Sequence, residues 1–291
     1  MLSVHLFGVF TISLNGQRLN DQLGPSGRQL AAFLLHFRGR SHRREKLVDQ
    51  FWGHLDPEAA RAALNTGLWR LRKILALDQN RSNIVAQGGN IILETSASFS
   101  IDTHRFCGSL QQALRLRCEL GTNLLPSLEA AIQEYTGPFM DGDDADWILE
   151  ERERLLSLYV RATYEAMQLY GLQGRYEDAI AAARLILVVD PFRESVVRVL
   201  GVLFVLNGQR AEAIRYFDRW KGLFKRELCV DPMPATLRLA DDLRSGKIFE
   251  HMEALRNEYL SQVGDEDKHY REEPPDRRTR SDRSFVDIAS T

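Results

Sequence analysis

The sequence predicts a mainly α-helical protein with a small antiparallel β part. Three observations support this fold class. Apolar and polar residues alternate near the N-terminus, as they do in half-buried strands. Apolar residues then recur at helical spacing, and two helical segments repeat each other at an offset of 34 residues. The length of 291 residues is enough for about two domains, at roughly 150 residues per domain.

Composition excludes several classes of protein. Hydrophobic residues make up 44% of the chain and charged residues 27%, which is ordinary for a globular protein. No window approaches the roughly 18 consecutive apolar residues of a membrane span, and the N-terminus has no basic leader. Cys107, Cys118 and Cys229 have no metal-ligand spacing and are interpreted as reduced thiols. We therefore expect a cytoplasmic protein without membrane association.

The net charge of −2 conceals an asymmetry along the chain. Residues 1–100 contain 12 Lys and Arg against 7 Asp and Glu, a net charge of +5. Residues 101–291 carry a net charge of −7. A basic N-terminal part joined to an acidic remainder suggests a polyanionic partner for the first hundred residues.

The N-terminal segment is predicted to form a small antiparallel sheet. Its apolar residues alternate with polar ones: Val4, Leu6, Phe10, Ile12 and Leu14. Asn15-Gly16 is the favoured two-residue hairpin turn, because both residues tolerate a positive φ.

Three helices are predicted next. The first covers about Gly27–Phe37. The second begins after Ser41 as its N-cap and stops at Gly53. The third has Asp56 as N-cap, followed by a proline at the first helical position, and runs to about Leu77.

A β-hairpin is predicted after the third helix. Ile84-Val85-Ala86 and Ile91-Ile92-Leu93 flank the turn Gln87-Gly88-Gly89-Asn90. The predicted order of elements is therefore sheet, three helices and hairpin.

The third helix has one apolar stripe and one polar face. The stripe contains Leu64, Leu68, Leu71 and Leu75. The opposite face and its flanks contain Ala62, Asn65, Thr66, Trp69, Arg70, Arg72 and Lys73. Arg can bind guanine and Asn adenine in bidentate fashion, whereas Lys and Arg neutralise phosphates. Such a face suits the major groove of DNA, although a solvated helix surface is the simpler alternative.

Arg43 and Arg44 fall in the predicted first turn of the second helix, where the helix dipole disfavours cations. A phosphate bound at that helix N-terminus would remove the conflict. These two arginines and an exposed Trp69 favour a binding surface over an ordinary solvated helix surface.

The order of elements resembles the winged helix of OmpR/PhoB-type regulators, and Arg70-Leu71-Arg72-Lys73 resembles part of that family's recognition helix. The run from Leu47 to Trp52 is similar to the second-helix signature of the Streptomyces antibiotic regulatory proteins. Trp69 stands where a basic or polar residue is usual, and the hairpin turn lacks the family's usual arginine.

This resemblance implies roles for ten residues. Five would face the major groove: Arg61, Asn65, Thr66, Trp69 and Arg70. Four would contact phosphates: Arg43, Arg44, Arg72 and Lys73. The hairpin, with Gln87 at its turn, would be the wing.

A repeat of 34 residues, the tetratricopeptide period, marks the second half of the chain. Tyr170, Gly174, Ala179 and Ile180 recur as Phe204, Gly208, Ala213 and Ile214. A third, degenerate helix pair is expected in about 106–135.

An acidic loop lies between these segments. Asp141, Asp143 and Asp144 do not follow EF-hand spacing, so a calcium loop is disfavoured. We expect a capped helix start followed by a solvated acidic face. That face would contain Glu150, Glu151 and Glu153.

The second half resembles the bacterial transcriptional activation domain of the same regulators. The resemblance rests on Gly137-Pro138-Phe139, Trp147, Glu150–Arg154, Asp190–Glu194 and Glu227–Pro232, in that order. We therefore predict three parts: an OmpR/PhoB-type winged-helix DNA-binding domain in residues 1–100, a tetratricopeptide-like activation domain in residues 101–245, and a C-terminal helix extension with a disordered charged tail in residues 246–291.

The sequence indicates no enzyme. We find no phosphate-binding loop, no metal-ligand spacing among the seven histidines and no nucleophile motif. No catalytic residue, metal or cofactor is therefore predicted.

The first functional hypothesis is a sequence-specific transcriptional activator. As the family resemblance implies, it would bind direct repeats in double-stranded DNA as a homodimer, and its helical domain would mediate dimerisation and contact RNA polymerase. The alternative is a tetratricopeptide-like interaction adaptor with a degenerate winged helix. A third possibility is that the helical domain binds a small molecule. A continuous positive face formed by Arg43, Arg44, Arg70 and Lys73 would favour the first hypothesis, and neutralising carboxylates the second.

Overall fold

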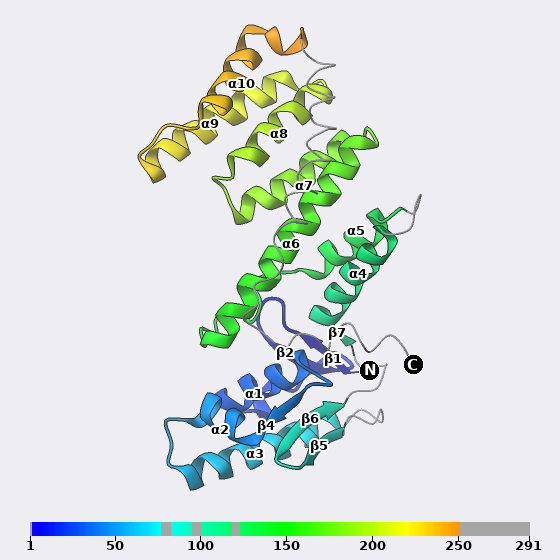
Figure 1. Ribbon diagram of the computed structural model, residues 1–291, viewed down its shortest axis with the longest axis vertical. Helices are drawn as coiled ribbons and strands as arrows, with labels where there is room; N and C mark the ends of the chain where they lie inside the picture. Colours follow the sequence, from blue (N-terminus) through cyan, green and yellow to red (C-terminus); the bar gives the residue numbers. More distant parts are fainter. Residues whose placement is uncertain (1, 77–82, 95–99, 118–122, 251–291) are drawn as a thin grey trace. The chain divides into compact units, whose positions relative to one another are not determined.

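The computed structural model describes residues 2–76, 83–94, 100–117 and 123–250. It is mainly helical, with two small sheets in the described part, as the sequence predicts (Figure 1). The chain divides into two compact units, residues 1–163 and 164–291. The division falls within the long helix α6 (Asp146–Leu172).

The N-terminal sheet has the strand order β3-β2-β1-β7. Its strands are β1 (Leu2–His5), β2 (Thr11–Leu14), β3 (Gln17–Arg18) and β7 (Ser100–Ile101). Asn15 and Gly16 connect β2 to β3 with φ angles of 49° and 85°, which confirms the predicted turn. The β1–β7 pair is parallel, so the sheet is not wholly antiparallel as predicted. Parallel pairing requires a long crossover, which local periodicity does not reveal.

The three predicted helices are α1 (Pro25–His36), α2 (Arg44–Trp52) and α3 (Pro57–Leu75), and a short 3-10 helix, η1 (Asn20–Gln22), precedes them. The Asp56 carboxylate accepts hydrogen bonds from the amides of Glu58 (3.1 Å) and Ala59 (3.0 Å), which confirms the predicted N-cap of α3. The predicted end near Leu77 lies outside the described residues.

The second sheet has the order β4-β6-β5 and lies beside α1, α2 and α3 (Figure 1). Its strands are β4 (Ser41–Arg43), β5 (Asn83–Gln87) and β6 (Asn90–Glu94). The β5–β6 hairpin is as predicted, but Ser41 does not cap α2. Ser41 pairs with Ile92 in β4–β6, and the N-cap position of α2 is Arg43, which makes no side-chain cap.

One hydrophobic core extends through the first unit. It includes side chains of the N-terminal sheet, of α1–α3 and of the helices α4 (Asp102–Arg117), α5 (Leu125–Glu134) and α6. Asp102 joins these parts, because its buried carboxylate accepts hydrogen bonds from the amides of Leu6 (2.8 Å) and Phe7 (3.0 Å) in the N-terminal segment. The predicted domain boundary at residue 100 is therefore bridged by shared core.

A buried polar pair lies in the same core. His36 of α1 donates from Nε2 to Glu151 of α6 at 2.7 Å, and Arg154 donates to the same carboxylate from Nε at 2.9 Å. Burial alone would raise the pKa of Glu151, but these hydrogen bonds outweigh it and lower the pKa to about 2. The prediction of Glu151 on a solvated face is wrong, since the residue is only 7% exposed.

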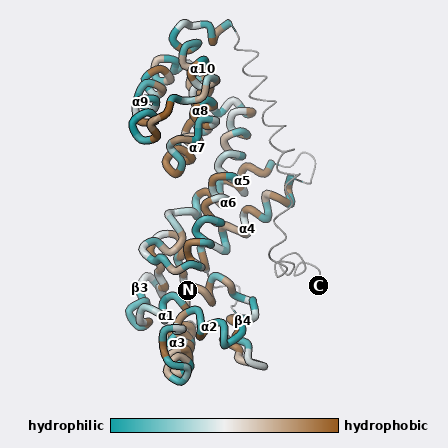
Figure 2. Tube along the Cα trace, turned by 60° about the vertical axis from the view of Figure 1, so that its left-hand side comes forward, coloured by the Kyte–Doolittle hydropathy of each residue, from teal (hydrophilic) through white to brown (hydrophobic). Residues whose placement is uncertain are grey.

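The second unit contains the end of α6 and the helices that follow it. They are α7 (Tyr176–Val189), α8 (Glu194–Leu206), α9 (Arg210–Leu228), α10 (Pro234–Ser245) and the 3-10 helix η2 (Lys247–Phe249). Hydrophobic residues run through α7 and α8 (Figure 2). Most of the tail predicted from residue 246 lies outside the described residues.

The 34-residue repeat is visible in the backbone of the two turns. The Arg175 amide donates to the Tyr170 carbonyl at 2.9 Å, and the Gln209 amide to the Phe204 carbonyl at 2.7 Å. Gly174 and Gly208 have φ angles of 73° and 72°. The repeated alanines, Ala179 and Ala213, are fully buried, as expected where paired helices approach closely.

Candidate nucleic-acid interface

Helix α3 is held against α1 and α2 by its apolar stripe. Leu64, Leu68, Leu71 and Leu75 are all buried, as predicted. Gly67 also faces inward, and a Cβ there would lie 3.1 Å from Cδ2 of Leu30 and 3.5 Å from Cη2 of Trp52. This packing fixes which face of α3 is left to solvent.

The exposed face of α3 carries the side chains that the sequence assigns to it. Arg61, Asn65, Thr66, Trp69, Arg70, Arg72 and Lys73 are all exposed. Trp69 is 60% exposed, and the Lys73 ammonium lies 5.6 Å from the centre of its ring, within the range of a cation–π interaction. The Thr66 hydroxyl donates to the Ala62 carbonyl at 2.9 Å, back along the helix.

The start of α2 adjoins the turn of the β5–β6 hairpin. The Arg44 amide donates to the Gly89 carbonyl at 2.9 Å, and Arg43 pairs with Asn90 across the sheet. Gln87 is exposed at the same turn. The structure therefore brings together Arg43, Arg44 and Gln87, which lie far apart in the sequence.

A hydrogen bond and a shared groove join the start of α2 to α3. The Arg44 guanidinium donates to Oδ1 of Asn65. Arg44 and Arg61 also line one groove of about 390 Å³, together with the carboxylates of Glu45 and Asp49. Asn65 is thus oriented by an arginine from α2.

Arg72 and Arg70 have different surroundings. The Arg72 guanidinium donates to the Ile84 carbonyl of β5 at 3.1 Å and so ties the hairpin to α3. The predicted phosphate contact of Arg72 stays a prediction. Arg70 lies beside the loop before α1, because its Nη1 is 3.7 Å from where a Cβ of Gly24 would stand.

The candidate face carries cations without carboxylate partners. Among the described residues, none of the six predicted cations forms an ion pair: Arg43, Arg44, Arg61, Arg70, Arg72 and Lys73. Arginines of α9 differ, since Arg215 pairs with Glu212 at 2.7 Å and Arg226 with Glu227 at 3.0 Å. Such a face can attract a polyanion.

Sequence reasoning missed several contacts of this region. The Arg44–Asn65 and Arg72–Ile84 hydrogen bonds join different elements, so no single periodic pattern contains them. Arg18 and Arg28 line a pocket near the start of α1, and no signal in their local sequence marks them. In the described parts of the chain no group of three or more His, Cys, Asp or Glu side chains is placed to hold a metal ion.

Comparison with known families identifies the second half of the chain. Residues 101–244 match the model of the bacterial transcriptional activator domain. These residues form a domain of this family.

Regulatory proteins of Streptomyces and Mycobacterium are similar to the chain over more residues than the matched domain contains. Regulatory protein AfsR of Streptomyces griseus is 27% identical over 233 residues, which are 77% of this chain but 23% of AfsR. Transcriptional regulatory protein MoaR1 of Mycobacterium tuberculosis is 25% identical over 242 residues, 79% of this chain and 75% of MoaR1. The chain thus spans about a quarter of AfsR and most of MoaR1.

The fold has a solved counterpart. The structure of Mycobacterium tuberculosis EmbR in complex with a low affinity phosphopeptide has a TM-score of 0.64 and 21% identity, and it covers 91% of this chain and 71% of EmbR. At that identity the likeness concerns the fold alone. No helix in the described segments has the length and apolar character needed to cross a membrane.

Proposed function

We propose that the chain is a DNA-binding regulator of transcription, and specifically an activator. Residues 1–100 act as a winged helix, with α3 in the major groove and the β5–β6 hairpin as the wing. Arg61, Asn65, Thr66, Trp69 and Arg70 face the bases. Arg43, Arg44 and Lys73 contact phosphates, and Gln87 lies at the wing. The relatives, named as regulatory proteins, support the regulatory role.

The observation that carries the proposal is the unpaired positive face around α3. Six cations on β4, α2 and α3 make no ion pair with a carboxylate in the described part of the chain. Cations that lie close together without carboxylate partners repel one another in the unbound protein. Binding of DNA phosphates relieves this repulsion. This contrasts with α9, where neighbouring acids neutralise the arginines.

The contacts within the interface refine two of the roles. Arg44 holds Oδ1 of Asn65, so Asn65 presents its amide N–H₂ group as a donor to a base edge. Arg72 positions the wing through the Ile84 carbonyl, and its second contact is a phosphate. The helical part, residues 101–245, provides dimerisation on direct repeats and contact with RNA polymerase. No catalytic residue, metal or cofactor is assigned.

The test is fluorescence anisotropy of the full chain with duplex DNA from its own upstream region and with random duplex, at about 50 and 200 mM salt. Arg70→Ala should lose about 1–3 kcal/mol on the upstream fragment and discriminate less between the two DNAs. Arg43→Ala should weaken binding to both DNAs alike and reduce the slope of log K against log salt by about 1.

Arg238→Gln on α10 is the matched control, since it removes the same charge from an exposed position on another helix. The role assignment fails if Arg70→Ala and Arg43→Ala lose the same amount on both DNAs. It also fails if Arg238→Gln weakens binding as much as either.

A second candidate function is supported by an apolar patch on α7. Leu185, Val188 and Val189 share one face of its last turns and are 42%, 79% and 36% exposed. Exposed apolar side chains at helical spacing suit a protein partner. The chain is an interaction adaptor instead if two results are found together. It binds neither the upstream fragment nor the random duplex at 50 mM salt, and it co-purifies with a protein that the Val188→Glu variant no longer retains.

A further inference from the structure

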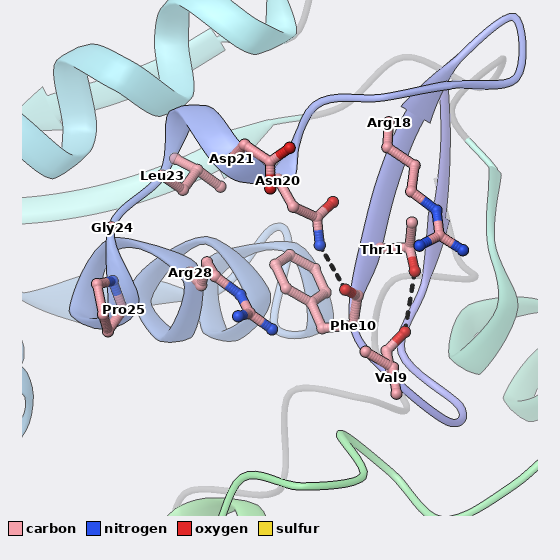
Figure 3. Close-up of a pocket in the computed structure, with 10 residues that line it drawn as sticks. All are labelled: Val9, Phe10, Thr11, Arg18, Asn20, Asp21, Leu23, Gly24, Pro25 and Arg28. Atoms are coloured by element: carbon pink, nitrogen blue, oxygen red, sulfur yellow. Dashed lines mark hydrogen bonds between the residues drawn. The ribbon is translucent and has the colours of Figure 1, made fainter.

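A pocket of about 300 Å³ lies between β2, η1 and the first turn of α1. It is separate from the ten residues assigned to the DNA interface. Phe10, Leu23 and Pro25 contribute apolar surface to its walls, and Arg18, Arg28 and Asp21 contribute charge (Figure 3). Its volume is at the lower end of the range of small-molecule sites, roughly 300–1,000 Å³.

The two arginines of the pocket have no protein partner in the described residues. Neither the Arg18 nor the Arg28 side chain makes a hydrogen bond or ion pair there, although Asp21 lines the same pocket. Nε of Arg28 is buried without an acceptor. A buried donor left unpaired is costly, so an acceptor supplied by a ligand would stabilise it.

The start of α1 adds a second attraction for negative charge. The N-cap, Gly24, has no side chain to accept the first amides, and the first turn contains no acidic residue. The N-terminal end of a helix with free amides carries partial positive charge and binds anions. Arg28 projects from the same helix toward Phe10 (Figure 3).

The walls of the pocket are fixed by hydrogen bonds rather than by the charged groups. Oδ1 of Asn20 accepts from the Ile12 amide at 2.7 Å, and Nδ2 of Asn20 donates to the Phe10 carbonyl (Figure 3). This holds η1 against β2. The pocket is therefore pre-formed, and the arginines remain available.

We propose that this pocket binds a small-molecule anion, a phosphate ester or carboxylate with an apolar body. The anionic group lies between Arg18, Arg28 and the start of α1, and the apolar body packs on Phe10 and Leu23. Asp21 accepts a hydrogen bond from a ligand hydroxyl or amine. A carboxylate and apolar walls in the pocket suit such a ligand better than a DNA phosphate.

The pocket lies next to Arg70 of α3. Gly24 lines the pocket, and a Cβ on Gly24 would stand 3.7 Å from Nη1 of Arg70. An occupied pocket can therefore influence the position of Arg70. That consequence rests on the proposed function, whereas ligand binding itself does not involve DNA.

The experiment uses the full chain, with phenyl phosphate and inorganic phosphate as probes, at constant ionic strength. Calorimetry measures affinity, and the ¹⁵N-detected Nε–H signal of Arg28 reports the site. We expect saturable binding of both probes, with phenyl phosphate the tighter because its ring reaches the apolar wall. Arg28→Gln and Arg18→Gln should each weaken binding about tenfold or more, and Arg28→Lys less than Arg28→Gln.

Arg238→Gln is again the matched control and should bind as the unaltered chain does. Melting temperatures of all variants, without probe, identify any loss that comes from unfolding. The proposal is overturned if binding does not saturate, or if Arg28→Gln and Arg238→Gln bind phenyl phosphate equally.

A further arm distinguishes the other source of phosphate. The decisive outcome is a lack of phenyl phosphate binding, combined with a reduced salt dependence of binding to random duplex in both Arg18→Gln and Arg28→Gln. The pocket would then contact the DNA backbone, and the small-molecule proposal would be wrong. Failure of all DNA binding, with phenyl phosphate still bound, would reject the proposed function and leave this inference standing.

Discussion

His104 is a partly buried histidine whose protonation is set by its surroundings. It lies on α4 and donates from Nε2 to the His36 carbonyl at 2.6 Å. Burial is the main cause that lowers its pKa, from 6.5 to about 4, and the charge of Arg38 adds to it, while the hydrogen bond to His36 opposes it. The folded protein therefore keeps this imidazole neutral at pH 7.

Stability should fall as pH falls from 6.5 to 4. In this window the unfolded chain protonates His104 and the folded chain does not, so unfolding takes up about one proton, or up to about 1.4 kcal/mol per pH unit. Below pH 4 both states are protonated and the effect ends. Urea unfolding at several pH values measures it. His104→Gln keeps a donor but does not titrate, so its slope should be shallower; equal slopes would contradict the assignment. The contribution of Glu151 to stability is lost at lower pH, as the pH falls from 4.5 to about 2.

Residue-level predictions from sequence succeed where the cause is local. Asp56 caps α3 because the amides it accepts from follow two and three residues later. Glu151 shows the opposite case. Its acidic neighbours suggest a solvated face, but its partner His36 is 115 residues away, and only the folded chain brings them together.

At the scale of elements, α8 and α9 approach each other closely at a glycine. A Cβ on Gly201 would stand 2.5 Å from Cε2 and 3.2 Å from Cζ of Phe217, whose ring is buried. Ring atoms of a buried Phe cannot move without displacing their neighbours. The contact therefore requires glycine.

Gly201→Ala should destabilise the protein by about 1–3 kcal/mol, because overpacking outweighs the roughly 1 kcal/mol that alanine gains in helix propensity. Gly222→Ala on α9 is the matched control, since nothing lies within 4 Å of a Cβ there. That variant should be neutral or slightly stabilised. Chemical denaturation of both variants measures the difference, and equal stabilities would show that Phe217 adjusts freely.

Elements follow from the sequence when their pattern is contained in one segment. The β2–β3 turn, α3 and the 34-residue repeat have that property, and all are found. Strand β4 does not. Ser41 appears as a helix cap when only the residues after it are considered, but its backbone pairs with Ile92, about fifty residues later. The Arg44–Asn65 contact depends on the same non-local arrangement.

At the scale of the whole molecule, the N-terminal hundred residues do not contain a complete core. Phe7 packs on the ring of Phe106 with centroids 5.4 Å apart, and Phe139 packs on His36 at 4.9 Å. The family match begins at residue 101, within this shared core. The boundary of the family match, at residue 101, thus differs from the boundary of the first compact unit, at residue 163.

A fragment of residues 1–100 should therefore fold less cooperatively than a fragment of residues 1–172. The shorter fragment exposes Phe7 and removes the Asp102 acceptor of the Leu6 amide. Near-UV circular dichroism during thermal unfolding compares the two. A sharp transition of the short fragment at the temperature of the long one would show that the first hundred residues are independent.

The exposure of Trp69 gives the protein an optical property. The chain has four tryptophans, and of these Trp52 and Trp220 are 6% and 5% exposed, and Trp147 is partly buried. Iodide in solution can therefore collide far more readily with the indole of Trp69 than with the other three. Steady-state fluorescence of the unlabelled chain thus carries a component that reports directly on what covers α3.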